Sequence, residues 1–428
     1  MTKACVHPTF TLIASLRVAA LAVALMSGLT LVSGHIAQAQ TFAVVHSFTR
    51  GQDGANPWGG LAMDAAGNLY GTATTGGVAN CLGGCGTVFK LAFKNSNWTL
   101  SPLYNFTGAP DGAYPEGRLI FGRDGRLYGT TGQGGAQPSE CQSSGCGTVF
   151  ALRPQAAFCQ AVLCFWSEDV LYRFNGGDDG SRPTGDSVFD QAGNFFGTTF
   201  NSGASGVGTV YELSPSGGGW TESVIHSFSG SDGANPYAGL TQDSAGNLYG
   251  PTKIGGLYRP GGVVFELSNT QSGWTENILH NFNGTDGDEP LGGLVRDASG
   301  NIFGTTNHGG QGGGGGGQVF ELTQSGGSWN LALLHGFNGT AGPWADLAMD
   351  SSGALYGTTV QDGAHGLGSI FKMTFSGGSW TYTTIHDFNG DDGANPHGNI
   401  LIDANGNLYG TAVGGGAHSS GVVWEITP

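Results

Sequence analysis

One sequence unit recurs seven times along the chain, and this repetition limits the possible folds more than any other feature. Each unit carries a short aromatic marker, His/Tyr-x-Phe, and most markers are about 50 to 60 residues apart. The markers are His46-Ser47-Phe48, Tyr104-Asn105-Phe106, Tyr172-Arg173-Phe174, His226-Ser227-Phe228, His280-Asn281-Phe282, His335-Gly336-Phe337 and His386-Asp387-Phe388. A repeat of this length is typical of propellers and solenoids, in which each unit must pack against its neighbours.

The fourth unit shows how one repeat divides into strands. Four short runs rich in β-branched and aromatic residues, termed strands a to d, alternate with turns. They are residues 238–243, 247–252, 263–267 and 274–282. The turn between a and b, Asp243-Ser244-Ala245-Gly246, has Asp first and Gly fourth, a common type I signature. Four antiparallel strands of this kind predict one propeller blade.

The two ends of the repeated region indicate how the blades close into a ring. Residues 41–48 form a strand d with no a, b or c before it, and residues 421–426 form a strand c with no d after it. We therefore expect the N-terminal strand to complete the last blade, which removes the open edges of a linear array. The prediction is an all-β protein: a seven-bladed β-propeller of four-stranded antiparallel blades.

Residues 1–39 are typical of a secretory signal peptide. Lys3 and Arg17 precede or border an apolar stretch at residues 18–32, and Ala37-Gln38-Ala39 fits the small-residue cleavage pattern. The alternative is an uncleaved membrane anchor, for which the apolar stretch is short. We expect residues 40–428 to form a single propeller domain that is secreted, extracellular or periplasmic, monomeric and without a membrane span.

Composition agrees with a β fold and excludes two classes of partner. Glycine accounts for 81 of 428 residues, which disfavours long helices because each interior Gly costs a helix about 1 kcal/mol relative to Ala. The formal net charge of −16 repels nucleic acid and anionic membrane surfaces, so neither is expected as a partner.

Cysteine spacing predicts local disulfides. Cys5 lies in the leader, and the other six cysteines form three close pairs. The pairs are Cys81/Cys85, Cys141/Cys146 and Cys159/Cys164. Other pairings remain open, but local pairing is the simplest, and no C-x2-C spacing points to a metal. We predict no metal site and no cofactor.

Most residues that suggest chemistry belong to the repeated scaffold. Six of the nine tryptophans lie six residues before a marker, so they are assigned to strand d packing. Tyr replaces His in two markers, which favours aromatic packing with a polar tip over metal binding. The repeated Asp-Gly loops that follow the markers could suggest calcium, but each offers too few carboxylates, so a turn-forming role is preferred.

The side chains that do not repeat are the better candidates for function. In the loop from strand d to the next strand a, the residue after Pro and the second residue beyond it vary from blade to blade. These positions enter the innermost strand and should therefore surround one mouth of the central channel, with His308, His365 and His418 in b–c loops on the same face. The candidate ligand-binding residues are Trp58, Glu116, Arg118, Asp186, Tyr237, Trp344, Asp346, His397 and Asn399.

The repeat also resembles a known family. The units Gly67-Asn68-Leu69-Tyr70-Gly71-Thr72 and Gly208-Thr209-Val210-Tyr211-Glu212-Leu213 are similar to the GloVer (Gloeo/Verruco) tandem repeat of exported bacterial proteins. The resemblance covers nearly all of the chain after its leader and implies no activity. Members of this family often carry a C-terminal surface anchor that is not found here. The second unit departs from the pattern, with Gly122-Arg123-Asp124-Gly125-Arg126 at its a–b turn.

Three functions are compatible with these residues. The first is a binding module for a glycan or a protein, with aromatic rings for stacking and polar groups for orientation. The alternative is a polysaccharide-degrading enzyme, a glycoside hydrolase or lyase, with Glu116, Asp186 or Asp346 as carboxylates or His397 in acid–base work. A third is metal binding by His308, His365, His397 and His418. No motif fixes a reaction, so the sequence leaves catalysis undecided.

Overall fold

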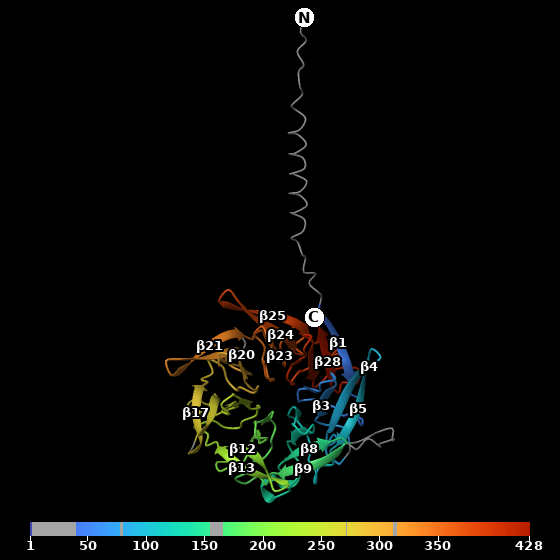
Figure 1. Cartoon of the computed structure of the whole chain (residues 1–428), viewed down its shortest axis with the longest axis vertical. Coiled ribbons are helices and arrows are strands. Elements are labelled where there is room, and N and C mark those ends of the chain that lie inside the picture. Colours follow the sequence, from blue (N-terminus) through green and yellow to red (C-terminus); the bar gives the residue numbers. More distant parts are fainter. Residues whose placement is uncertain (2–39, 78–79, 155–165, 271, 311–314) are drawn as a thin grey trace. The chain divides into compact units, whose positions relative to one another are not determined.

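The repeats fold into seven four-stranded antiparallel sheets, as predicted. The computed structural model describes residues 1, 40–77, 80–154, 166–270, 272–310 and 315–428. Within them the regular elements are 28 strands and one short 3-10 helix, η1 (Ser139–Ser144). In the unit Thr41–Thr427 the sheets are arranged around a central axis, each with one strand inside and one outside (Figure 1). This is a seven-bladed β-propeller.

The strands have nearly constant bounds from blade to blade. Strands a are β2 Ala62–Met63, β6 Ile120–Phe121, β10 Val188–Phe189, β14 Thr241–Gln242, β18 Val295–Arg296, β22 Ala348–Met349 and β26 Leu401–Ile402. Strands b are β3 Leu69–Ala73, β7 Leu127–Thr131, β11 Phe195–Thr199, β15 Leu248–Thr252, β19 Ile302–Thr306, β23 Leu355–Thr359 and β27 Leu408–Ala412. Strands c are β4 Thr87–Lys94, β8 Thr148–Arg153, β12 Thr209–Ser216, β16 Val263–Thr270, β20 Gln318–Ser325, β24 Ser369–Ser376 and β28 Val422–Thr427. Strands d are β5 Asn97–Asn105, β9 Ser167–Arg173, β13 Gly219–Ser227, β17 Gly273–Asn281, β21 Ser328–Gly336, β25 Ser379–Asp387 and β1 Thr41–Ser47.

The innermost strands are shorter than the sequence predicts. Strand a of the fourth blade is expected over residues 238–243, but its ladder contains only Thr241 and Gln242. The preceding residues turn toward the adjacent blade, where Leu240 N donates to Asp186 O at 3.2 Å. The segment before each short strand a therefore lines the channel.

The predicted ring closure is confirmed. β1 pairs with β28 in an antiparallel ladder that runs from Thr41↔Thr427 to Ser47↔Val422, with one irregularity after Val44. The last blade therefore has the strand order β1-β28-β27-β26. Two distant parts of the sequence share one sheet, and no blade is left with three strands.

Each blade interface is built on the five-residue strand b. All five residues of β15 are buried, and Gly250 at its centre lies opposite Phe265 of β16. A Cβ at Gly250 would lie 2.9 Å from the Phe265 ring. The repeated Leu-Tyr-Gly sequence therefore reserves space for an aromatic ring from strand c, and close packing between blades follows from it.

The marker residues have the packing role that the sequence predicts. His280 packs edge-on against Phe282 at 4.8 Å between centroids, and its Nε2 lies 3.1 Å from Asp286 Oδ2. Asp286 also accepts from the backbone N–H of Asn283 at 2.8 Å. Equivalent contacts join His46 to Asp53, Tyr104 to Asp111, Tyr172 to Asp179 and His386 to Asp392. These aspartates fix the turn after each marker.

Two glutamates of strand d add a pH-dependent contact to this scaffold. Glu168 accepts from Tyr104 OH at 3.2 Å, and burial together with the charge of Asp111 raises the pKa of Glu168 to about 8. Burial and the charge of Asp179 raise the pKa of Glu222 to about 7. The folded chain thus binds these two protons more tightly than the unfolded chain, whose reference pKa is 4.5. Their favourable contribution is complete below that value and is lost as the pH rises through 7 to 8.

We expect the double variant Glu168→Gln/Glu222→Gln to gain stability at alkaline pH alone. Glutamine imitates the protonated carboxyl, so Tm should rise by about 2 °C at pH 8 and change little at pH 5. Differential scanning calorimetry at both pH values measures the effect, and Glu212→Gln controls for the removal of one negative charge. A lower Tm of the double variant at pH 8 would contradict this assignment.

The loop disulfides agree with the predictions where the structure describes them. Cys81–Cys85 and Cys141–Cys146 are bonded. Both lie in b–c loops, of the first and second blades. Cys159, Cys164 and nearly all of the leader at residues 1–39 lie outside the described residues. The described helices include none that is long and apolar enough to cross a membrane.

Candidate functional site

The non-repeated residues come together at the central channel. Eight of the nine candidates line one small cavity of about 50 Å³: Trp58, Glu116, Asp186, Tyr237, Trp344, Asp346, His397 and Asn399. The ninth, Arg118, is bonded to Asp186 in the same channel. They enter from the segments that precede the strands a of six different blades. The residues that do not repeat from blade to blade are therefore neighbours in the folded protein.

Four of these side chains form an aromatic layer. The Trp58 and His397 rings have centroids 4.2 Å apart, and His397 lies 5.0 Å from Trp344. Trp344 also packs edge-to-face with Trp58 and with Tyr237, each at 5.9 Å. All four rings are half-buried. The aromatic residues thus pack on one another across the channel and still present part of their surface.

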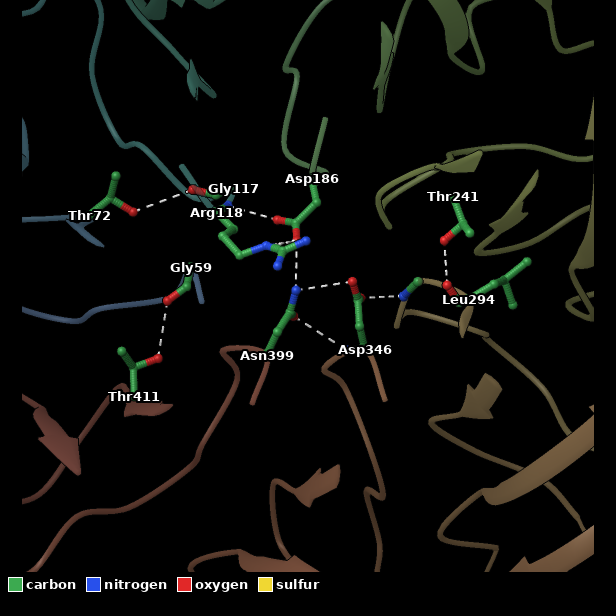
Figure 2. Close-up of polar contacts among 11 residues, drawn as sticks. Gly59, Thr72, Gly117, Arg118, Asp186, Thr241, Leu294, Asp346, Asn399 and Thr411 are labelled. Atoms are coloured by element: carbon green, nitrogen blue, oxygen red, sulfur yellow. Dashed lines mark hydrogen bonds and ion pairs between the residues drawn. The ribbon is translucent and has the colours of Figure 1, made fainter. Parts of the chain in front are cut away.

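A polar network joins four of the other five side chains across the blades (Figure 2). Asp186 accepts from Arg118 N at 2.7 Å, from Arg118 Nε at 2.9 Å and from Asn399 Nδ2 at 2.6 Å. The same Asn399 nitrogen donates to Asp346 Oδ2 at 3.0 Å, and Gly293 N donates to Asp346 Oδ1. Every one of these bonds links residues of different blades. The network therefore fixes the positions of the innermost segments around the axis.

Glycines in the other blades leave room for this network. The positions equivalent to Asp346 and Asn399 are Gly60, Gly239 and Gly293 in the first, fourth and fifth blades. A Cβ at Gly293 would lie 2.8 Å from the carboxyl carbon of Asp346, and one at Gly60 would lie 3.0 Å from Asn399. The glycines, which have no side chain, therefore leave space for the Asp and Asn side chains of the neighbouring blades.

The network holds two carboxylates against one guanidinium. Burial raises the pKa of Asp346 to about 6, the charge of Asp186 adds to the rise, and Gly293 N–H, Arg118 and Asn399 oppose it. The charge of Asp186 raises the pKa of Arg118, whose side chain is only partly buried, so this arginine stays charged. With two carboxylates and one guanidinium, the polar network thus carries net negative charge at pH 7.

His397 and Glu116 are affected mainly by burial. Burial lowers the pKa of His397 to about 4, and its Nδ1 lies 2.9 Å from Asn395 O, so the ring is neutral at pH 7. Burial also raises the pKa of Glu116, against the opposing effect of Arg182 at 3.6 Å. Tyr237 OH donates to Glu116 Oε2 at 3.5 Å. Glu116 therefore joins the aromatic layer to an arginine of a neighbouring loop.

The four histidines of the metal hypothesis do not come together. His397 lies in the aromatic layer, whereas His308 is 3.6 Å from Glu289 in a b–c loop. Among the described residues, the one group with converging metal-binding atoms consists of His226 on strand β13, Asp232 in the loop after β13 and Glu276 on strand β17. This group cannot be recognised from the repeat, because His226 occupies the same position as the other marker histidines, which pack as part of the scaffold.

A second cavity lies between the second and third blades. Its volume is about 810 Å³, and its lining includes Arg123, Arg126, Tyr128, Arg153 and Trp220. Arg126 pairs with Asp169 at 3.2 Å, and Arg153 pairs with the same carboxylate at 2.6 Å. The unusual a–b turn of the second unit, which departs from the repeat, supplies Arg123 and Arg126 to this groove and is its signal in the sequence.

The fold and the repeated interfaces define a tandem-repeat β-propeller. Residues 30–169, 139–342 and 275–428 match the Gloeobacter/Verrucomicrobia repeat family, so the chain belongs to this family. No curated protein matches the sequence.

Solved structures with the same fold share little sequence. A fungal alcohol oxidase of the AA5 family in complex with copper has 17% identity and a TM-score of 0.56, over 91% of this chain and 77% of its own. A protein described as a 6-phosphogluconolactonase from Bacteroides uniformis has 14% identity and a TM-score of 0.47, over 76% and 83%. A protein described as a gluconolactonase has 12% identity and a TM-score of 0.42, over 91% and 92%. At these identities the similarity shows the fold alone.

Proposed function

We propose that this protein is an exported β-propeller that binds a glycan at the mouth of its central channel, on the face formed by the d–a and b–c loops. One observation carries the proposal: the side chains that do not repeat meet at one place and bond to one another across six blades. A purely structural channel would need no such variety, because the repeated residues already close each blade interface.

The two layers supply what a glycan-binding surface needs. The half-buried rings of Trp58 and Trp344 offer apolar surface on which a sugar ring can stack. In the lining of the same cavity, the Asp186, Asp346 and Asn399 side chains are held in place by hydrogen bonds, so they need no ordering when a ligand arrives. Apolar surface with a few fixed polar groups is the usual composition of a ligand site.

The geometry favours binding over hydrolysis. Asp186 and Asp346 accept from the same Asn399 nitrogen, at 2.6 and 3.0 Å, so their oxygens are close enough to suggest a carboxylate pair. However, the cavity that these carboxylates line has a volume of about 50 Å³, which is enough for a few water molecules but too small for a sugar ring. A glycosidase would first have to separate the aromatic layer.

Export is part of the proposal. Two disulfides in the described loops suit an oxidising compartment, and the sequence of residues 1–39 suits secretion. The acidic charge argues against nucleic acid as a partner. We propose that residues 40–428 act as a monomer outside the cytoplasm.

A glycan array with matched variants tests the proposal. We expect residues 40–428 to bind a limited set of glycans and Trp58→Ala/Trp344→Ala to weaken binding at least about tenfold, because each ring supplies stacking surface. The variant Arg123→Ala/Arg126→Ala in the groove between the second and third blades is the control and should bind like the parent. Thermal unfolding of each variant establishes that it is folded.

Each other outcome has a defined meaning. Loss of binding in the groove variant alone would move the site away from the channel mouth. No binding to any glycan would overturn the carbohydrate proposal and favour a protein ligand.

A further inference from the structure

The marker of the third blade differs from five of the other six markers in its contact with the following loop. Five markers make a direct polar contact of 2.7–3.1 Å with the Asp of that loop. His226 Nε2 instead lies 3.5 Å from Asp232 Oδ2, beyond the usual hydrogen-bond range. Its Nε2 is buried and has no hydrogen-bond partner. The loop from His335 to Pro343 contains no Asp, so among the six markers that are followed by an Asp in this loop the contact is opened only at His226.

A third side chain from the next blade faces the opened contact. Glu276 of β17 places Oε2 at 3.7 Å from His226 Nε2. Its other oxygen, Oε1, is also buried without a hydrogen-bond partner. The residue equivalent to Glu276 opposite His280 is Leu331, four residues before its own marker, and there the His280–Asp286 contact stays at 3.1 Å. The presence of Glu276 thus coincides with the opened pair.

The spacing of the three groups fits a small divalent ion. One ligand atom from each of His226, Asp232 and Glu276 lies within 4.8 Å of the others. In a tetrahedral zinc site with bonds of about 2.1 Å, ligand atoms are about 3.4 Å apart, close to the separations of 3.5 and 3.7 Å found here. One imidazole with two carboxylates suits zinc better than calcium, which prefers six to eight oxygens.

We propose that His226 Nε2, Asp232 and Glu276 bind one zinc ion on the outer rim of the propeller. The ion would join β13 of the third blade, through His226, to β17 of the fourth, through Glu276, with water at the remaining position. It would give the unpartnered His226 Nε2 a ligand bond and neutralise two carboxylates at once. His226 and Glu276 lie on the outer strands β13 and β17, and none of the three ligands lines the cavity of the proposed glycan site.

Zinc binding by the purified protein tests the site. Residues 40–428 are prepared without a polyhistidine tag, treated with EDTA and titrated with zinc by calorimetry, with metal content measured after dialysis. We expect one zinc per chain, and a rise in Tm of about 3 °C when free zinc is 100 times the dissociation constant.

The variants are taken from the neighbouring blades. Glu276→Leu introduces the residue type that faces His280 in the next blade, and Glu276→Gln keeps the shape of the side chain. Both variants should weaken zinc binding at least about 100-fold. Glu222→Gln changes the equivalent strand d position, opposite Tyr172, and should bind zinc like the parent. Two Glu276 variants keep the test valid if one of them does not fold.

Two results would overturn the proposal. Absence of stoichiometric zinc would leave the cluster as a proton-sharing contact, and unchanged zinc in both Glu276 variants would place the ion elsewhere, for example at the loop histidines.

Discussion

Deletion of residues 41–48 is expected to abolish cooperative folding of the propeller. The segment supplies all of β1, whose ladder with β28 extends over six paired positions. It also supplies Phe48, which is fully buried and lies 5.2 Å from the ring of Phe89 in the first blade. The truncated chain would expose the edge of β28 and leave a void between the first and last blades, where the ring must close.

The loss of cooperative folding in the truncated chain should be visible as aggregation in size-exclusion chromatography and as the absence of a sharp thermal transition. A single Phe48→Ala variant provides the milder comparison, with an expected cost of about 3–5 kcal/mol for a deleted core ring. A truncated protein that unfolded as cooperatively as the parent would contradict the idea that β1 closes the ring.

A circular permutant tests whether the fold needs strand β1 itself or needs β1 at the N-terminus of the chain. Thr41 pairs with Thr427, so two residues can join them as a hairpin. The c–d hairpin of the third blade supplies the design, because Ser216 and Gly219 pair across Gly217 and Gly218, which have φ of 57° and 91°. A chain that starts at Gly51 and joins Thr427 to Thr41 through Gly-Gly should fold like the parent.

The sequence predicts most of this fold because each blade interface is repeated. The Leu-Tyr-Gly strand and the marker Phe recur in fixed positions, so the strand patterns of the seven repeats support one another. The isolated strand d at residues 41–48 then predicts that the first and last strands close the ring. The prediction of strand a as residues 238–243 was too long because Leu240 bonds to the neighbouring blade. A contact between blades leaves no local pattern in the sequence.

The candidate residues could be predicted as a group but not in their arrangement. Variation after the Pro of each d–a loop identified Trp58, Trp344 and Asp346. It could not show that the rings pack edge-on against one another, because this depends on side-chain geometry at the axis. The rim cluster was missed for a different reason: His226 occupies a repeated position, and the informative change is the appearance of Glu276 where another blade has Leu331.

Replacement of Arg118 by Met is expected to destabilise the fold strongly at neutral and alkaline pH. Arg118 is the one cation of the Asp186–Asn399–Asp346 network, so its loss leaves two close carboxylates without a counter-charge. Breaking a fully buried pair costs about 3–5 kcal/mol, but the Arg118 side chain retains 37% exposure, so we expect about 2–4 kcal/mol. For a chain of this length the loss corresponds to a fall in Tm of about 3–5 °C.

The loss of stability caused by Arg118→Met should become smaller as the pH falls. This pH dependence is expected if the loss comes from charge repulsion, and it is not expected if the loss comes from packing. The pKa of Asp346 is already raised to about 6 in the parent, so at pH 5 this carboxyl takes up a proton and the repulsion with Asp186 is relieved. Thermal unfolding at pH 8 and pH 5 measures the difference, with Arg123→Met as the control for removing an exposed arginine. The double variant Arg118→Met/Asp346→Asn should recover part of the stability at pH 8, because only one carboxylate then remains. An equal loss at both pH values would instead assign the role of Arg118 to packing of its aliphatic stem.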